Sequence, residues 1–242
     1  MLMSVIEGAY EAPAYPELAG KRVLITGVSS SSGVDVARAF AEHKARLILQ
    51  FAEESEAMQC VAEVVAPHAL DVEVYGPIDN DSEGIVQFSR AVAQSFGRLD
   101  AVINLVPLDA DRLDPAAGAS TVERMVAQRL LLPCLLSKIA ANRMSLCYAD
   151  GLILNVATLA AHRPGAAHAF ATVARSALAA MTRSQAQEWA ARGIRFNAIA
   201  PSVQLPFQAS PWGEPDIAAL ALYLASGQGK ELSGHVFEAE AA

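Results

Sequence analysis

The chain has 242 residues, of which 53% are hydrophobic and 18% are charged, and its formal net charge is −8. This length suits one large domain, and the composition supports a well-buried core and excludes an intrinsically disordered chain. The acidic balance and the scattered arginines exclude nucleic acid as a partner, because phosphate binding needs clustered Lys and Arg. No uncharged apolar stretch is long enough to span a bilayer, so we expect no membrane partner.

The start of the chain and its cysteines bear on where the protein works. Residues 1–20 predict a polar, proline-containing arm without the basic and apolar regions of a secretion signal. Cys60, Cys134 and Cys147 are widely spaced and follow no metal-ligand pattern. They predict buried free thiols in a reducing compartment and no metal site. We therefore expect a cytoplasmic protein with a single domain over residues 21–242.

Strand and helix signals alternate along this domain. Short apolar runs predict buried parallel strands over residues 22–26, 46–51, 71–75, 100–106, 151–156, 194–200 and 235–238. Helical spacing of apolar residues predicts helices over residues 33–43, 54–65, 82–96, 121–142, 166–191 and 215–226. Ser82 is the predicted N-cap of the third helix, and Gly193 is the predicted stop of the fifth. The alternation predicts an α/β fold, a doubly wound parallel sheet of about seven strands with helices on both faces.

The first strand-to-helix turn reads TGVSSSSG from Thr26 to Gly33. Such a turn offers free N–H groups at a helix N-terminus, where a pyrophosphate binds, and its glycines let the phosphate approach the backbone. Further blocks follow in order: GRLDAVIN at 97–104, NVAT at 155–158, HRPG at 162–165 and RGIRFNAIAP at 192–201. In order and spacing, the turn and these blocks together resemble the short-chain dehydrogenase/reductase family over about residues 21–237.

The resemblance implies a Rossmann-type domain and a site for NAD(P) that is degenerate in this chain. Gly27 and Gly33 match family glycines, but Ser31 replaces the middle one and would crowd the diphosphate. Phe51 replaces the acidic or basic residue that selects between NAD and NADP, and Asp79 lies one residue from the position that holds the adenine amino group. The other candidate cofactor contacts are Ser29, Asn104 and Pro201. The resemblance thus implies NAD(P) binding that is weak or absent, and no metal.

The catalytic positions depart further from the family. Its Asn, Ser, Tyr and Lys match Arg129, Thr158, Ala171 and Arg175. A methyl group cannot transfer a proton, and a guanidinium hardly deprotonates, so the substitutions predict impaired chemistry. His168 lies one helical turn before Ala171 and is either a substitute acid or an ordinary packed histidine. Thr158 is either a hydroxyl contact for a substrate or a packing residue at a strand end.

The two long apolar helices, residues 121–142 and 166–191, match those that form the main interface of the family. They predict a dimer or tetramer. Three functions stay open. The first, which we favour because an intact core accompanies these losses, is a non-catalytic homo-oligomer or a hetero-oligomer with an active paralogue. The second is an atypical NAD(P)-dependent oxidoreductase acting on a small alcohol or carbonyl compound, and the third is a ligand-binding or regulatory module.

Overall fold

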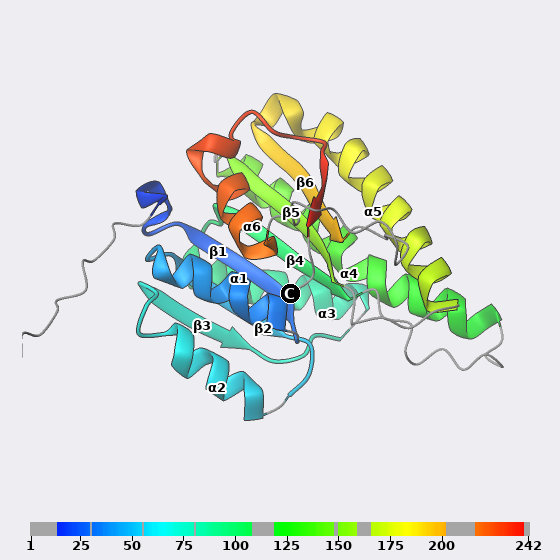
Figure 1. The fold of residues 1–242 in the computed structure, drawn as a ribbon, viewed down its shortest axis with the longest axis horizontal. Helices are drawn as coiled ribbons and strands as arrows, with labels where there is room; N and C mark the ends of the chain where they lie inside the picture. The colour runs from blue at the N-terminus through cyan, green and yellow to red at the C-terminus, as the bar shows by residue number, and fades with distance from the viewer. Residues whose placement is uncertain are drawn as a thin grey trace, which may run out of the picture.

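A computed structural model describes residues 14–29, 31–54, 56–79, 81–107, 119–147, 150–158, 166–201 and 216–239. Seven strands form one parallel sheet in the order β3-β2-β1-β4-β5-β6-β7 (Figure 1). The strands are β1 (Arg22–Val28), β2 (Arg46–Phe51), β3 (Asp71–Tyr75), β4 (Ala101–Pro107), β5 (Gly151–Thr158), β6 (Ile194–Pro201) and β7 (Val236–Ala239). The helices are α1 (Ser31–Glu42), α2 (Glu56–Val65), α3 (Ser82–Phe96), α4 (Ala119–Leu146), α5 (Ala166–Trp189) and α6 (Ile217–Ala225). The predicted doubly wound α/β fold is confirmed.

The sheet is buried on both faces, so the molecule has two apolar layers. Helices α1, α2 and α6 cover one face, and α3, α4 and α5 cover the other (Figure 1). Phe40 of α1 fills the first layer and Phe196 of β6 the second, and both are fully buried. Burial on both faces explains why β4 and β5 are almost unbroken apolar runs rather than alternating ones.

The two predicted helix boundaries had different outcomes. Helix α5 ends in a short 3₁₀ turn, and Gly193 follows it with φ +71° in the left-handed region, which confirms the glycine stop. The predicted N-cap of α3 is wrong. Asp81 caps this helix, because its carboxylate accepts a hydrogen bond from the Gly84 N–H at 2.7 Å, and Ser82 is the first helical residue. Two residues able to cap stood side by side, and the apolar pattern could not choose between them.

The burial predicted for the cysteines is wrong, because none of the three is fully buried. All three are free thiols, but Cys60 on α2 is exposed, whereas Cys134 and Cys147 are half-buried. Within the ranges given above, no three His, Cys, Asp or Glu side chains gather as metal ligands would. In the same ranges, none of the helices has the length and apolar character needed to cross a membrane.

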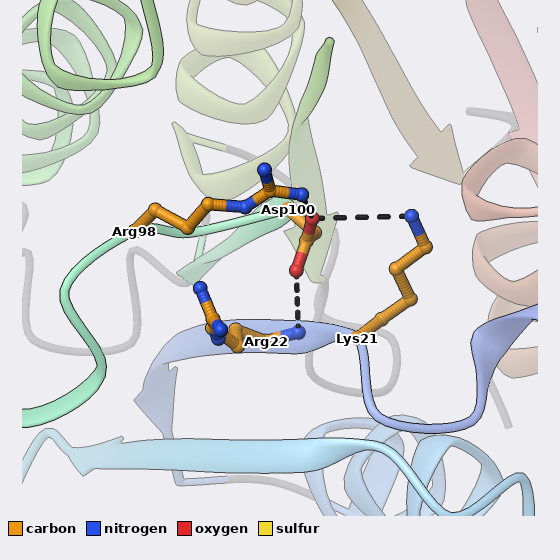
Figure 2. A network of polar contacts seen from close by, with 4 residues as sticks. All are labelled: Lys21, Arg22, Arg98 and Asp100. Carbon is orange, nitrogen blue, oxygen red and sulfur yellow. Dashed lines mark hydrogen bonds and ion pairs between the residues drawn. The ribbon is translucent and has the colours of Figure 1, made fainter. Parts of the chain in front are cut away.

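At the amino ends of the strands, ionic contacts join the start of β1 to the segment just before β4. Asp100, just before β4, accepts a hydrogen bond from the Arg22 N–H at 2.9 Å and one from the Arg98 guanidinium at 2.8 Å, with the Lys21 ammonium at 3.9 Å (Figure 2). The described part of the predicted arm also packs here. Leu18 lies in a 3₁₀ turn that Pro16 begins, and it is only 1% exposed. A proline suits the first position of such a turn, because its missing N–H has no partner there.

Candidate cofactor and substrate site

The order of the strands locates the candidate site. The chain builds β1, β2 and β3 outward in one direction and then returns to place β4 against the other side of β1. In sheets of this kind, ligands bind in the crevice outside the carboxyl ends of the strands, where the order reverses. Those ends hold Gly27 and Val28 of β1, Phe51 of β2, Pro107 of β4 and Thr158 of β5.

The glycines of the turn are required by close packing. Gly27 has φ +73°, and a Cβ there would lie 2.4 Å from the carbonyl oxygen of Leu105. A Cβ on Gly33 would lie 2.7 Å from the Leu105 Cδ1, so this glycine lets α1 approach β4. The predicted contact Ser29 is exposed beside the turn, whereas the side chain of Ser31 lies outside the described residues. The backbone of the turn thus keeps the close approach that a pyrophosphate site needs.

Gln50 joins the ends of three strands at this edge. Its Oε1 accepts a hydrogen bond from the Gly27 N–H at 2.9 Å. Its Nε2 donates to the carbonyl of Phe51 and, at 3.2 Å, to the carbonyl of Gly76 just after β3. The pairing of β1 with β2 shifts register between Ile25 and Val28. The Gln50 side chain therefore bonds to β1 where the regular pairing of β1 with β2 is interrupted.

Phe51 at the end of β2 is a core residue. It is 4% exposed and packs in the layer beneath α1, where it pairs in register with Val28. A phenyl ring has no hydrogen-bonding atom, so this position offers nothing to a ribose hydroxyl or a ribose phosphate. Asp79, one residue along the chain from the expected adenine position, is exposed after β3 and lies against Gly84, whose added Cβ would come within 2.7 Å of the Asp79 Cβ.

Asn104 lies within β4 and is buried inside the protein. It is 1% exposed, and its Nδ2 donates to the Ser137 hydroxyl at 3.0 Å and to the Asn155 Oδ1 at 2.9 Å. Its Oδ1 accepts from the Thr26 hydroxyl at 3.0 Å. The side chain predicted to contact a cofactor is therefore engaged in bonds that join β1, β4, β5 and α4.

The candidate catalytic residues are distributed over α4, β5 and α5. Thr158 ends β5, where it is 8% exposed and pairs in register with Pro107. Arg129 of α4 and Arg175 of α5 are both half-buried. Pro133 stands inside α4 and has no N–H, so it cannot donate the helical hydrogen bond to the carbonyl of Arg129. The remaining predicted positions, whose backbone is described but whose side chains are not, are His168, Ala171 and Pro201.

These residues fit a dinucleotide only in part. The turn keeps the backbone that a diphosphate would approach, but β2 ends at Phe51, whose ring cannot hydrogen-bond to the adenosine ribose, and the exposed carboxylates of Glu53 and Glu54 follow it. The Gly27 N–H is already bonded to Gln50. Phe51 thus departs from the usual recognition of NAD or NADP at the adenosine end.

A half-buried arginine with a shifted pKa lies at the opposite edge of the sheet. Arg195 of β6 donates to the carbonyls of Leu224 and Gly229 at 2.8 and 2.7 Å. Burial lowers the pKa of its guanidinium, and the nearby carboxylate of Asp150 opposes that shift. A cavity of about 220 Å³ beside these residues also lies at the amino ends of the strands, away from the candidate site.

Comparison with known proteins decides the family. A family model described as short chain dehydrogenase matches residues 21–211. The chain belongs to the short-chain dehydrogenase family. It is 30% identical over 245 residues to momilactone A synthase of Oryza sativa subsp. japonica, covering 90% of this chain and 88% of that protein. It is 29% identical over 182 residues to an uncharacterized oxidoreductase of Thermotoga maritima, covering 75% of this chain and 71% of that protein.

Solved structures agree with the family on the fold. A short chain dehydrogenase from Mycobacterium smegmatis superposes with a TM-score of 0.77 at 22% identity, covering 95% of this chain and 97% of that one. Members of the short-chain dehydrogenase family normally bind NAD(P) and act as oxidoreductases. The family membership and the Rossmann-like architecture predicted from the sequence are therefore confirmed.

Sequence reasoning missed two residues of this short-chain dehydrogenase site. Gln50 and Ser137 each hold buried polar contacts at or beneath the sheet edge, and both are 2% exposed or less. Each was visible as a polar residue inside an apolar run, RLILQF and LLSKIAA. Such residues are hydrogen-bonded when buried, which was a signal that could have singled them out.

Proposed function

We propose that this chain is a catalytically impaired short-chain dehydrogenase homologue that works as an oligomeric or supporting subunit. The observation that carries the proposal is the burial of Phe51, which is 4% exposed where the family holds its ribose-selecting residue. The neighbouring Gln50 uses the Gly27 N–H within the protein. Together they support NAD(P) binding that is weak or absent.

The substitutions at the catalytic positions support the same proposal. In the family, the tyrosine phenol donates or takes the proton of the substrate alcohol, and bound NAD(P) supplies or accepts the hydride. Ala171 stands at the tyrosine position and Arg175 at the lysine position. General acid–base catalysis contributes about 10²–10⁴-fold to a rate, and this chain would lose it at these positions.

The outer surfaces of α4 and α5 support an assembly. Leu132 and Leu135 of α4 are only half-buried, although both pack at the margin of the core. Val173 of α5 is 60% exposed and Leu146 of α4 is 66% exposed. Apolar side chains left open on two neighbouring helices favour burial against another subunit, either a second copy or an active paralogue.

The first test is binding of the four cofactors. The full chain is titrated with NAD⁺, NADH, NADP⁺ and NADPH while thermal unfolding is followed, with an active short-chain dehydrogenase as the control. A ligand at a hundredfold excess over its Kd stabilises the folded state by about 2.7 kcal/mol. We expect no shift for this chain and a clear one for the control. A saturable shift, together with hydride transfer to an ordinary family substrate, would overturn the proposal.

A second candidate function is an atypical NAD(P)-dependent oxidoreductase for a small alcohol or carbonyl compound. It is favoured by the intact backbone of the turn at Gly27 and Gly33 and by the hydroxyl of Thr158 at the end of β5. Relatives named as oxidoreductases also favour it. Turnover that His168→Ala abolishes, with cofactor binding unchanged, would select this function over the first.

A further inference from the structure

The cavity at the amino ends of the strands carries charges of both signs. It measures about 220 Å³ and lies among the starts of β1, β4, β5 and β6 and the end of α6. One water molecule needs only about 10–15 Å³, so the cavity has room for a small molecule. Its charged lining consists of Lys21, Arg195 and Lys230 together with Glu17, Asp100 and Asp150. The positive and negative charges cancel, which favours a ligand without net charge.

Two of the three carboxylates already have donors within the protein. Asp100 accepts the hydrogen bonds and lies beside the cations described above at the start of β1 (Figure 2). Glu17 accepts a hydrogen bond from the Gly227 N–H at 2.9 Å. The carboxylate of the lining that is left for a ligand is therefore that of Asp150.

Asp150 and Arg195 carry opposite charges on neighbouring strands. Arg195 of β6 pairs in register with Leu152 of β5, and Asp150 lies two residues before Leu152. Burial lowers the pKa of the guanidinium, and the Asp150 carboxylate acts against that shift. No direct ion pair joins these two side chains. The two charges are thus near enough to attract each other, yet they do not touch, and both line the cavity.

Arg195 and Lys230 keep hydrogen-bond donors for a ligand. One guanidinium nitrogen of Arg195 donates to the carbonyls of Leu224 and Gly229. A guanidinium has five N–H donors, and these bonds leave the other two nitrogens without an acceptor among the described residues. Lys230 follows Gly229 directly, is exposed, and forms no ion pair with a described carboxylate. The cavity therefore offers donors on one side and the Asp150 carboxylate on the other.

We propose that this cavity binds a small zwitterion such as an α-amino acid. The carboxylate of the ligand accepts from the Arg195 guanidinium and the Lys230 ammonium, and the ammonium of the ligand donates to the Asp150 carboxylate. Each end then makes charge-assisted hydrogen bonds, and the ligand adds no net charge to a balanced lining. The site lies at the opposite edge of the sheet from the turn at Gly27. It goes beyond the supporting-subunit role and requires neither turnover nor NAD(P).

The test uses the full chain and isothermal titration with alanine, propionate and ethylamine at constant ionic strength. Propionate is alanine without its ammonium, and ethylamine is alanine without its carboxylate. We expect saturable binding of alanine. The other two probes should bind about tenfold more weakly or not at all, because each lacks one of the charge-assisted contacts.

Single-charge variants identify the site. Asp150→Asn and Lys230→Gln alter exposed side chains, so we expect their unfolding curves to match that of the parent. Each should weaken the binding of alanine by about threefold or more, because it removes one charged partner. Lys138→Gln is the matched control. Lys138 is an exposed lysine of α4, on the other face of the sheet, and its replacement should leave binding unchanged.

No saturable binding of alanine would overturn the proposal. Equally tight binding of propionate or ethylamine would also overturn it, because one charge would then be sufficient. Equal weakening by Lys138→Gln would do the same, since that result indicates general charge attraction. The NAD(P) titration reports on the other edge of the sheet, so none of these failures affects the supporting-subunit proposal.

Discussion

The side chain of Gln50 accepts a hydrogen bond from the Gly27 N–H at 2.9 Å and so ties the phosphate-type turn to the second strand. In the same position its amide donates to two carbonyls, those of Phe51 and Gly76. One glutamine thus connects β1, β2 and the segment after β3, at the edge where a dinucleotide binds in related folds. The contact makes the turn part of the packed structure.

Replacing Gln50 with leucine should destabilise the protein by about 1–3 kcal/mol, because it leaves the Gly27 N–H and two carbonyls without their partner. Urea denaturation measures the change. Gln87→Leu is the control, since Gln87 bonds only to Glu83 on the exposed side of α3, and we expect it to stay within about 0.5 kcal/mol of the parent. Equal effects of the two variants would show that the bridge contributes nothing to stability.

Phe51→Ala should cost about 3–5 kcal/mol, the range for removing a buried phenyl ring from a core. The comparison variant is Val74→Ala on β3, where the side chain is 36% exposed and much less should be lost. Denaturant midpoints at constant m-value provide the measurement. A cost below about 1 kcal/mol for Phe51→Ala would place the ring on an open surface and reopen the cofactor cleft.

The cap of α3 provides a comparison between adjacent residues. Asp81→Ala should destabilise the protein by about 1 kcal/mol, because the Gly84 N–H loses its acceptor. Ser82→Ala should change stability by less than about 0.5 kcal/mol, since Ser82 is exposed in the first turn. If thermal unfolding ranks the two variants in the opposite order, the helix begins one residue later than the structure shows.

The carboxyl of Glu17 should make the stability of the fold depend on pH. A hydrogen bond from the Gly227 N–H lowers the pKa of this carboxyl below its ordinary value of 4.5. Because the pKa of Glu17 is higher in the unfolded chain than in the folded one, the unfolded chain takes up the proton at a higher pH. The ionised carboxylate therefore stabilises the folded state at neutral pH. This stabilisation is lost as the pH falls below 4.5 and through the lower pKa of the folded state.

The measurement compares Glu17→Gln with the parent by urea denaturation between pH 7 and pH 3. We expect the parent to be more stable at pH 7 and the difference to shrink toward acid pH. Glu63→Gln, at an exposed carboxylate of α2, removes the same charge from a different place and controls for net charge. A difference that stays constant with pH would show that the Gly227 contact does not favour the charged form.

The fold was predictable because its strands and helices carry local signals. The bounds of β2, β3 and α3 agree with the sequence prediction, since each combines a clear period with a polar or glycine boundary. Longer elements were underestimated. Strand β1 continues through Gly27 to Val28, because tertiary packing overrides the local preference of glycine, and α4 (Ala119–Leu146) extends beyond both ends of the predicted helix over residues 121–142.

The candidate site was only half predictable. The sequence showed which residue types replace the usual ones at Phe51, Ala171 and Arg175. It also put Phe51 in a buried strand, but it could not identify the helix that covers the ring, because that depends on how α1 packs on β2. Nor could it identify Thr26, Ser137 and Asn155 as the hydrogen-bond partners of Asn104, since those residues come from three different elements. Long-range partners are fixed by the three-dimensional arrangement and leave no spacing in the chain.

The packing of α1 against α6 has a consequence for synthesis. These helices belong to the same buried layer, yet one follows the first strand and the other precedes the last. While the chain leaves the ribosome, the apolar side of α1 has no such cover until residues 217–225 have been made. Contacts between distant parts of a chain slow folding and leave apolar surface open in the meantime. We therefore expect nascent chains that stop before α6 to be bound by chaperones.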